Sequence, residues 1–345
     1  MRIVVLGTGP FAVPTCKRLL ADGHEIPLVV VRPLADPSAK KLPPTPVLDW
    51  ARENQLPIYQ PTSINDTTAI AELKKYRPDL LFVCDYGQIL SNDCLSAAPL
   101  GGINLHGSLL PRHRGAAPVQ WALLRGDERA GVSVIHMTPR LDAGPVLTTA
   151  ETLILPDENA GELEPRLAEL GVQATVHAIA QLSDWSKQVS DWSTTGELGR
   201  LQTSDGVTRA PRFVKAHGQL DFRLPAHYLV RLIRALQPWP GTFAELQLAD
   251  GKCMRMLVRS ARASIYISGH AAGHAWSCDT LQLGFEWPAP WRHVIAVATG
   301  SGTLLVARVQ PASKREMDAH EFLRGHSLFA GASFLLPELP LNELQ

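Results

Sequence analysis

Short apolar runs alternate with amphipathic segments through the first half of the chain. This alternation predicts a Rossmann-like α/β fold, a mostly parallel sheet with helices on both faces, because parallel strands need helical crossovers. The apolar runs that predict strands lie at residues 2–6, 26–31, 57–61, 79–84, 102–106, 131–137 and 145–155. The segments that predict helices lie at 11–23, 47–55, 66–78, 116–127 and 160–182, the last interrupted near Pro165 and Gly171.

The pattern changes after residue 184. Residues 184–212 are polar without a sustained period, which indicates a linker. A predicted helix at 224–236 precedes strand-like runs at 242–248, 254–267, 281–285, 293–299 and 303–311, which predict a small OB-like β-barrel. The predicted division is a first domain over 1–190, a linker over 191–208 and a C-terminal barrel domain over 209–335.

Composition excludes several classes of protein. The chain has 345 residues, of which 45% are hydrophobic, and no apolar run approaches the roughly 20 residues that a membrane-spanning helix needs. The first residues pass from a strand directly into a glycine-rich turn, without the long apolar region of a signal peptide. The five cysteines are scattered without metal or redox spacing, which favours reduced thiols in the cytoplasm.

The net charge of zero hides an asymmetry between the two parts of the chain. Residues 1–205 contain 18 Lys+Arg and 23 Asp+Glu, a balance of −5. Residues 206–345 contain the remaining 15 and 10, a balance of +5. A basic C-terminal part indicates an anionic partner such as nucleic acid, and the alternative is a chance excess on a solvated face.

Two weaker motifs lie near the N-terminus. The turn GTGPFA at residues 7–12 follows a strand and opens a helix, but Ala12 and Arg32 stand where a dinucleotide-binding fingerprint has its third glycine and its acidic residue. A tight turn is therefore the favoured interpretation. The long loop with Arg32, Lys40 and Lys41 either binds phosphate or is an ordinary solvated loop.

The strongest signal is the stretch INLHGSLLPRHRGAAP at residues 103–118. Asn104 and His106 are two residues apart at the end of a predicted strand, so their side chains point to the same side, at the edge where open α/β sheets bind ligands. Histidine can act as an acid, a base or an electrophile, and asparagine supplies a neutral donor. Asp142, in the loop MTPRLDAGPV, either caps a turn or reaches His106 and holds the imidazole charged and oriented.

Together, INLHGSLLPRHRGAAPVQWALLRGD and LDAGPV resemble the formyltransferases that use 10-formyltetrahydrofolate. The segments FAVP (11–14), KKLPPTPV (40–47), YGQIL (86–90), RALQPWPG (234–241) and VQPASKREMDAHEFLRG (309–325) extend the resemblance over nearly the whole chain. The C-terminal segments favour the members of this family that act on tRNA over the short purine-pathway member, which has no such domain.

The resemblance implies that a formyl group passes from 10-formyltetrahydrofolate to the α-amino group of methionyl-initiator-tRNA, for translation initiation. It implies a catalytic set of Asn104, His106 and Asp142, and we expect a monomer that needs no metal. The expected folate contacts are Tyr86, Gly87, Gln88, Ile89, Leu90, Ser108, Leu109, Leu110 and Pro111. The expected tRNA contacts are basic residues, namely Arg32, Lys40, Lys41, Arg209, Arg212, Lys215, Lys314 and Arg315.

The residue types suit this chemistry. Attack of the α-amine on the formyl carbon develops a tetrahedral oxyanion. A charged His106 and the Asn104 amide can each donate a hydrogen bond to it, worth on the order of 3 kcal/mol. Asp142 would keep His106 protonated and accept the proton of the amine through a water.

The chain also departs from the family pattern. Pro37, Ser38 and Ala39 stand directly before KKL, where the family usually has an arginine and glycines. Arg209 replaces a usual tyrosine, and Asp85 stands where a small residue is common. Residues 268–293 fit poorly, and a loop insertion is favoured there over a metal site at His270 and His274. Three alternatives are an amino-sugar formyltransferase, a non-catalytic RNA-binding module and a nicotinamide-dependent dehydrogenase. The segment KKLPPTP argues against the amino-sugar enzyme, and the intact Asn–His–Asp set argues against the non-catalytic module. The incomplete glycine pattern argues against the dehydrogenase.

Overall fold

The chain forms two compact units in the computed structural model, which describes residues 1–33, 44–187, 198–248, 251–283, 291–326, 328, 332–339 and 344. The first unit contains Met1–Val119, Glu128–Ile154 and Glu162–Arg212, and the second contains Gln120–Asp127, Leu155–Gly161 and Phe213–Gln345. The predicted phosphate-binding residues Lys40 and Lys41, and residues 191–197 of the predicted linker, lie outside the described residues.

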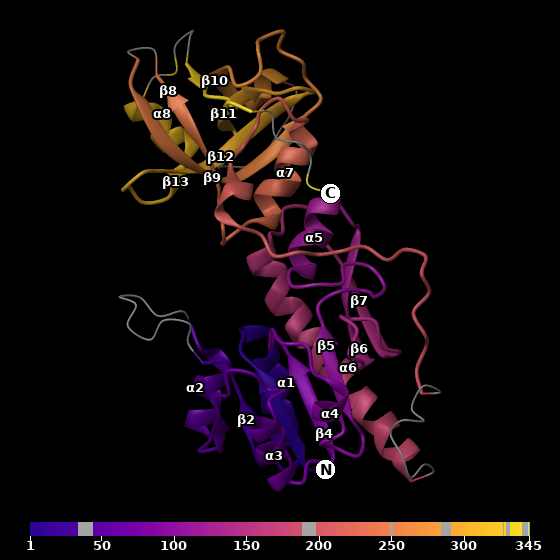
Figure 1. The fold of residues 1–345 in the computed structure, drawn as a ribbon. Helices are drawn as coiled ribbons and strands as arrows, with labels where there is room; N and C mark the ends of the chain where they lie inside the picture. Colours follow the sequence, from indigo (N-terminus) through magenta and orange to yellow (C-terminus); the bar gives the residue numbers. More distant parts are fainter. Residues whose placement is uncertain are drawn as a thin grey trace. The chain divides into compact units, whose positions relative to one another are not determined.

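The first unit is built on a seven-stranded sheet with the strand order β3-β2-β1-β4-β5-β6-β7 (Figure 1). Strands β1 to β5 pair in parallel, whereas β6 pairs antiparallel with β5 and with β7. Every residue of β1 and β4 is buried, because both faces of the sheet are covered. The strands are β1 (Ile3–Gly7), β2 (Val29–Val30), β3 (Ile58–Tyr59), β4 (Leu80–Cys84), β5 (Gly102–His106), β6 (Arg129–His136) and β7 (Val146–Leu153).

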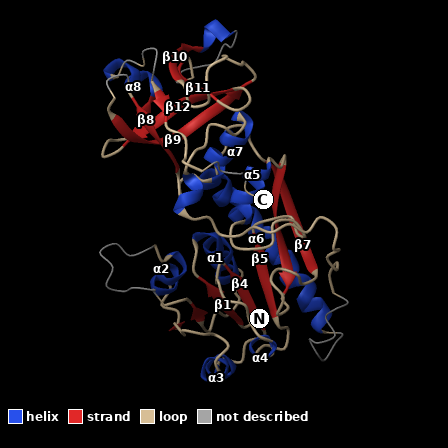
Figure 2. Cartoon of the chain, turned by 45° about the horizontal axis from the view of Figure 1, so that its top comes forward, coloured by secondary structure: helices blue, strands red, loops and turns tan. Residues whose placement is uncertain are grey.

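Helices lie on both faces of this sheet (Figure 2). On one face, the apolar side chains of β1 and β4 form a core cluster with those of α3 (Thr67–Lys75) and α4 (Asn92–Leu95). On the other face, Gly7 lies against α2 (Pro46–Glu53), where an added Cβ would meet Val47 at 3.4 Å. The short helix η1 (Pro10–Ala12) and the helix α1 (Val13–Ala21) follow β1 directly, as the turn motif predicts.

The long helix α6 (Ala160–Ser186) runs without a break, so the predicted interruption near Pro165 and Gly171 is wrong. Pro165 stands within the first two turns of the helix. Gly171 has a packing role, because a Cβ there would come within 2.8 Å of the Leu105 side chain on β5. A glycine inside a helical pattern therefore marks a close approach to the sheet here, and not a helix end.

The second unit is an antiparallel sheet with the strand order β10-β11-β12-β9-β8-β14 and with β13 paired to β12. Its two edges meet, since His274 beside β10 bridges Ser333 of β14 and the Ala275 amide donates to the Ala332 carbonyl. The sheet is therefore curled into a barrel. The strands are β8 (Thr242–Gln247), β9 (Cys253–Ser264), β10 (Ala275–Asp279), β11 (His293–Ala298), β12 (Thr303–Pro311), β13 (Met317–Asp318) and β14 (Ser333–Phe334).

Helices complete the second unit. The helix α7 (Ala226–Ala235) packs against β9, and Trp121 of α5 (Pro118–Arg125) stacks on Phe213 at a centroid distance of 5.1 Å. The remaining helices are η3 (Lys215–Gly218), η4 (Thr280–Leu283) and α8 (Ala319–Gly325). The predicted fold class, a mostly parallel α/β sheet followed by a small antiparallel barrel, is confirmed.

In the described ranges, no helix combines the length and the apolar character that crossing a lipid bilayer requires.

Candidate active site

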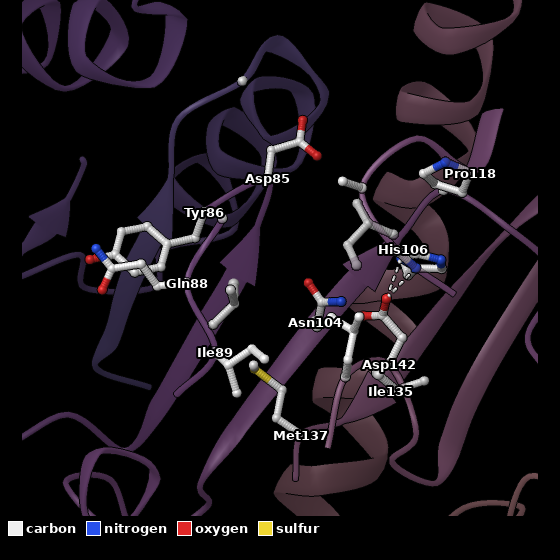
Figure 3. Close-up of a pocket in the computed structure, with 18 of the residues that line it drawn as sticks. Asp85, Tyr86, Gln88, Ile89, Asn104, His106, Pro118, Ile135, Met137 and Asp142 are labelled. Atoms are coloured by element: carbon white, nitrogen blue, oxygen red, sulfur yellow. Dashed lines mark hydrogen bonds and ion pairs between the residues drawn. The ribbon is translucent and has the colours of Figure 1, made fainter. Parts of the chain in front are cut away.

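A cavity of about 540 Å³ lies in the first unit, beyond the carboxyl ends of β1, β4 and β5 (Figure 3). This is the edge at which open α/β sheets bind ligands, and the volume is typical of a small-molecule site. Its lining includes the three residues predicted to be catalytic together with Asp85, Glu164 and Arg212. All of these residues belong to the first unit.

Asn104 and His106 reach the cavity from the end of β5 (Figure 3). Asn104 is half-buried, and only 6% of His106 is exposed. The ring Nε2 of His106 lies 2.9 Å from the backbone carbonyl oxygen of His113. Because a carbonyl can only accept, Nε2 carries the hydrogen in this contact. The other ring nitrogen, Nδ1, lies 3.8 Å from Oδ2 of Asp142.

Asp142 arrives from the loop between β6 and β7. Its backbone has a φ of +48°, in the left-handed region, which residues other than glycine adopt uncommonly, although aspartate does so more often than most. The backbone N–H of Gly115 donates to Oδ2 of Asp142 over 2.8 Å. The structure thus brings Asn104, His106 and Asp142 to one place, and their catalytic role stays a prediction.

Residues 198–212, which we name the strap, tie together the two loops that surround these side chains. Arg200 exchanges two backbone hydrogen bonds of 2.8 Å with Val146 at the start of β7. The side chain of Gln202 donates to the carbonyls of Asp142 and Gly144. Farther along, the Thr208 hydroxyl accepts from the His113 amide over 2.8 Å.

The strap cannot be recognised in the sequence, because its polar, aperiodic composition is also that of a linker. Its contacts connect residues about 60 and 95 positions apart, and no local pattern in the sequence records them. The predicted linker boundary itself stays a prediction.

Asp85 is a second acidic residue of the cavity, at the end of β4 on the opposite side of Asn104 from Asp142 (Figure 3). Its φ is +50°, and a Cβ on Gly9 would lie 2.5 Å from its Oδ2, so that glycine leaves room for the carboxylate. Asp85 is exposed to the cavity, but the pKa of its carboxyl is raised to about 6. The largest cause is the loss of hydration among the surrounding protein groups, and the nearby Glu164 carboxylate is the second, while a hydrogen bond from the Phe11 backbone acts in the opposite direction. Burial also raises the pKa of Glu164.

The predicted folate contacts separate into two groups. Tyr86, Gly87, Gln88 and Ile89 line the cavity, whereas Leu90 is buried in the core cluster beneath α3 and α4. The hydroxyl of Tyr86 is buried without a hydrogen-bond partner in the described part of the chain, and burial raises its pKa.

The second group, Ser108 to Pro111, does not belong to the cavity lining. The Ser108 hydroxyl donates to the Arg112 carbonyl over 2.7 Å, and Leu110 packs with Ile135 and Val146. These residues shape the turn after β5, and a folate contact at them stays a prediction.

The residues predicted to contact tRNA are spread over both units. Arg212 lines the cavity, and Arg32 lies against Gly87, where an added Cβ would come 3.1 Å from its Nη1. The remaining described ones are exposed: Arg209 in the strap, and Lys215, Lys314 and Arg315 in the second unit. Arg315 is paired with Glu321.

The two histidines of residues 268–293 have their rings close together in a tilted arrangement. The ring centroids of His270 and His274 are 4.1 Å apart, and Trp276 lies 5.5 Å from His270. Within the ranges that the structure describes, no three His, Cys, Asp or Glu side chains come together as a metal-binding group.

Comparison with known proteins matches both units. The formyl transferase family model matches residues 1–179, and the model of the formyl transferase C-terminal domain matches residues 212–327. A methionyl-tRNA formyltransferase from Rhodopirellula baltica is 43% identical over 98% of this chain and 97% of its own length. A methionyl-tRNA formyltransferase from Symbiobacterium thermophilum is 35% identical over 99% of this chain and 98% of its own length.

Solved structures share the fold at low identity. The sugar 3N-formyl transferase WlaRD, solved with dTDP and 5-N-formyl-THF, has a TM-score of 0.61 and 14% identity, covering 91% of this chain and 99% of its own. An N-formyltransferase from Helicobacter canadensis, solved with folinic acid and dTDP-3-aminofucose, has a TM-score of 0.60 and 12% identity, covering 89% and 98%.

The raised pKa of Asp85 predicts a pH-dependent stability. An ordinary aspartate has a pKa of about 3.9, so between about pH 4 and pH 6 the folded protein holds a proton here that the unfolded chain has lost. Stability at this site therefore falls as the pH rises through that window. The side chain of Asp85→Asn stays neutral, so the melting temperature of this variant minus that of the parent should increase as the pH rises from 4 to 7.

Thermal unfolding of parent and variant at several pH values checks this, with Asp93→Asn, an exposed carboxylate in α4, as the matched control. A difference in melting temperature between Asp85→Asn and the parent that stays constant from pH 4 to pH 7 would contradict the prediction.

Proposed function

The chain belongs to the formyl transferase family, and on this basis we propose that it transfers the formyl group of 10-formyltetrahydrofolate to the α-amino group of methionyl-initiator-tRNA. The observation that carries the proposal is similarity over the whole length, C-terminal domain included, to proteins named methionyl-tRNA formyltransferase. The likeness to sugar formyl transferases concerns the fold alone.

The catalytic proposal rests on how Asn104, His106 and Asp142 converge. Asn104 offers an amide donor, and the imidazole of His106 is oriented by the His113 carbonyl at one nitrogen and by Asp142 at the other. The Asn104 amide and the Nδ1 side of the His106 ring are the positions left to donate to the oxyanion that develops on the formyl oxygen, because Nε2 is already bonded to the His113 carbonyl. Asp142 orients the imidazole and takes up the amine proton through a water.

The two substrates suit different parts of the first unit. The co-substrate supplies the formyl carbon on its N10, and Tyr86 to Ile89 would hold its ring system at the apolar wall of the cavity. Arg212 in the lining and Arg32 beside Gly87 would receive the phosphates of the tRNA acceptor end. Lys40 and Lys41, which lie outside the described residues, are also proposed as tRNA contacts, on the basis of the sequence alone.

The rest of the tRNA would contact the C-terminal part of the chain. Residues 206–345 have a charge balance of +5, against −5 in residues 1–205. Lys215 and Lys314 are exposed in this C-terminal part. We also propose a catalytic domain at 1–190 and a tRNA-binding domain at 209–335, with a monomer working in the cytoplasm.

A transfer assay tests the proposed function. The full chain is incubated with 10-formyltetrahydrofolate and methionyl-initiator-tRNA, and formylmethionine is measured by mass spectrometry after the ester is hydrolysed. We expect formylmethionine, and Asn104→Ala should lower kcat by about 10²–10³-fold through loss of one oxyanion donor. A nucleotide-linked amino sugar is the competing acceptor. Transfer to the sugar with none to the tRNA would overturn the proposal.

The salt dependence of tRNA binding tests the basic surface. Lys215→Gln and Lys314→Gln should each weaken binding and lower the slope of log K against log salt by about 0.7 to 0.9, because each phosphate contact releases one counterion. Lys75→Gln, a surface lysine of α3 paired with Glu72, is the matched control. Slopes equal to that of the parent in both variants would show that these charges form a solvated face.

A further inference from the structure

We propose that Gln202 is a positioning residue for the formyl transfer, holding Asp142 in register with His106. The inference rests on the proposed function and assigns a role to a residue of the strap. Gln202 touches neither catalytic side chain and acts through the two loops that hold them.

The amide of Gln202 is fully used in hydrogen bonds. Its Nε2 donates to the carbonyl oxygens of Asp142 and Gly144, each over 2.8 Å. Its Oε1 accepts from Nε and Nη2 of Arg114, over 3.1 and 2.6 Å. A side chain amide has two N–H donors and one oxygen with two lone pairs, so this arrangement satisfies all of them.

The two ends of this bridge lie in the loops that carry the catalytic groups. Arg114 follows His113, whose carbonyl receives Nε2–H of His106, and precedes Gly115, whose N–H donates to the Asp142 carboxylate. On the other side, Gln202 holds the backbone of Asp142 itself. One side chain therefore fixes the distance between the loop that orients His106 and the loop that carries Asp142.

The loop that carries Asp142 depends on such support. Asp142 has a φ of +48°, a conformation that its own backbone does not favour. Gly144 passes so close to β6 that an added Cβ would lie 1.8 Å from the His136 carbonyl oxygen. Asp142 is thus held in an uncommon backbone conformation, and loss of the Gln202 donors removes a restraint at the residue that carries the carboxylate.

The strap brings Gln202 to this position by strand-like pairing. The backbone N–H and C=O of Arg200 are both hydrogen-bonded to the backbone of Val146, and Gln202 follows two residues later, next to the loop before β7. Beyond it, Arg114 and Ala210 are bonded through the Ala210 amide and the Arg114 carbonyl over 2.7 Å. The strap is therefore anchored on both sides of Gln202, which fixes where the amide stands.

The test separates positioning from general stability. Gln202→Met keeps the volume and removes the hydrogen bonds, and Gln202→Glu keeps an acceptor for Arg114 but turns a carboxylate toward two carbonyl oxygens. Both should lower kcat for formyl transfer by about tenfold or more, because each variant loses hydrogen bonds to the loop and the net contributions of these bonds add together. Gln237→Met is the matched control, because Gln237 bridges Arg259 and the Val258 carbonyl in the second unit. Gln237→Met should lower the melting temperature without lowering kcat at saturating concentrations of both substrates.

A double-mutant cycle decides whether Gln202 acts through Asp142. In an Asp142→Ala background, Gln202→Met should lower kcat less than twofold, since the carboxylate that it positions is gone. An equal loss in both backgrounds, or no loss in either, would overturn the proposal.

Hydrogen exchange gives a readout that does not depend on the acceptor. Exchange of the Gly115 amide, which is bonded to Asp142, should accelerate in Gln202→Met and stay unchanged in Gln237→Met. Unchanged exchange at Gly115 in Gln202→Met would also overturn the proposal. If the parent chain forms no formylmethionine but Gly115 exchange responds as expected, the proposed function fails and the positioning geometry stands.

Discussion

The site depends on satisfying the backbone of one tight loop after β6. Gln202 donates to the carbonyls of Asp142 and Gly144, and these two hydrogen bonds restrain a loop in which Asp142 has a left-handed backbone. Since the same amide accepts from Arg114, the loop after β5 is placed by the same contact. Both loops beside the proposed catalytic residues therefore contact a segment that lies far away in the sequence.

The sheet supplies the rest of the geometry. Val83 of β4 pairs with Asn104 of β5, so Asp85 at the end of one strand and His106 at the end of the next flank the same cavity. Gly9 after β1 makes room for the Asp85 carboxylate. Three neighbouring strands thus end at one cavity, and the chemistry follows from which polar residues stand at those ends.

Much of this was predictable, for reasons that are local. The apolar runs and the spacing of Asn104 and His106 determine the strand, its face and its edge, and the prediction of a ligand site there needs only those facts. Three features could not be predicted in the same way: the antiparallel pairing of β6, the unbroken path of α6 through Pro165 and the hydrogen bonds of the strap. They depend on contacts between distant segments, and a polar stretch such as residues 198–212 has the composition of a linker whether or not it is bonded.

The central claim is that His106 and Asp142 act as one unit because the two loops hold them together. The most direct measurement is kcat for formyl transfer by His106→Ala, Asp142→Ala and the double variant. Residues of one unit are strongly non-additive, so each single variant should lose a large and similar factor and the double variant little more. Losses that multiply in the double variant, or a His106→Ala protein with near-normal turnover, would contradict the claim.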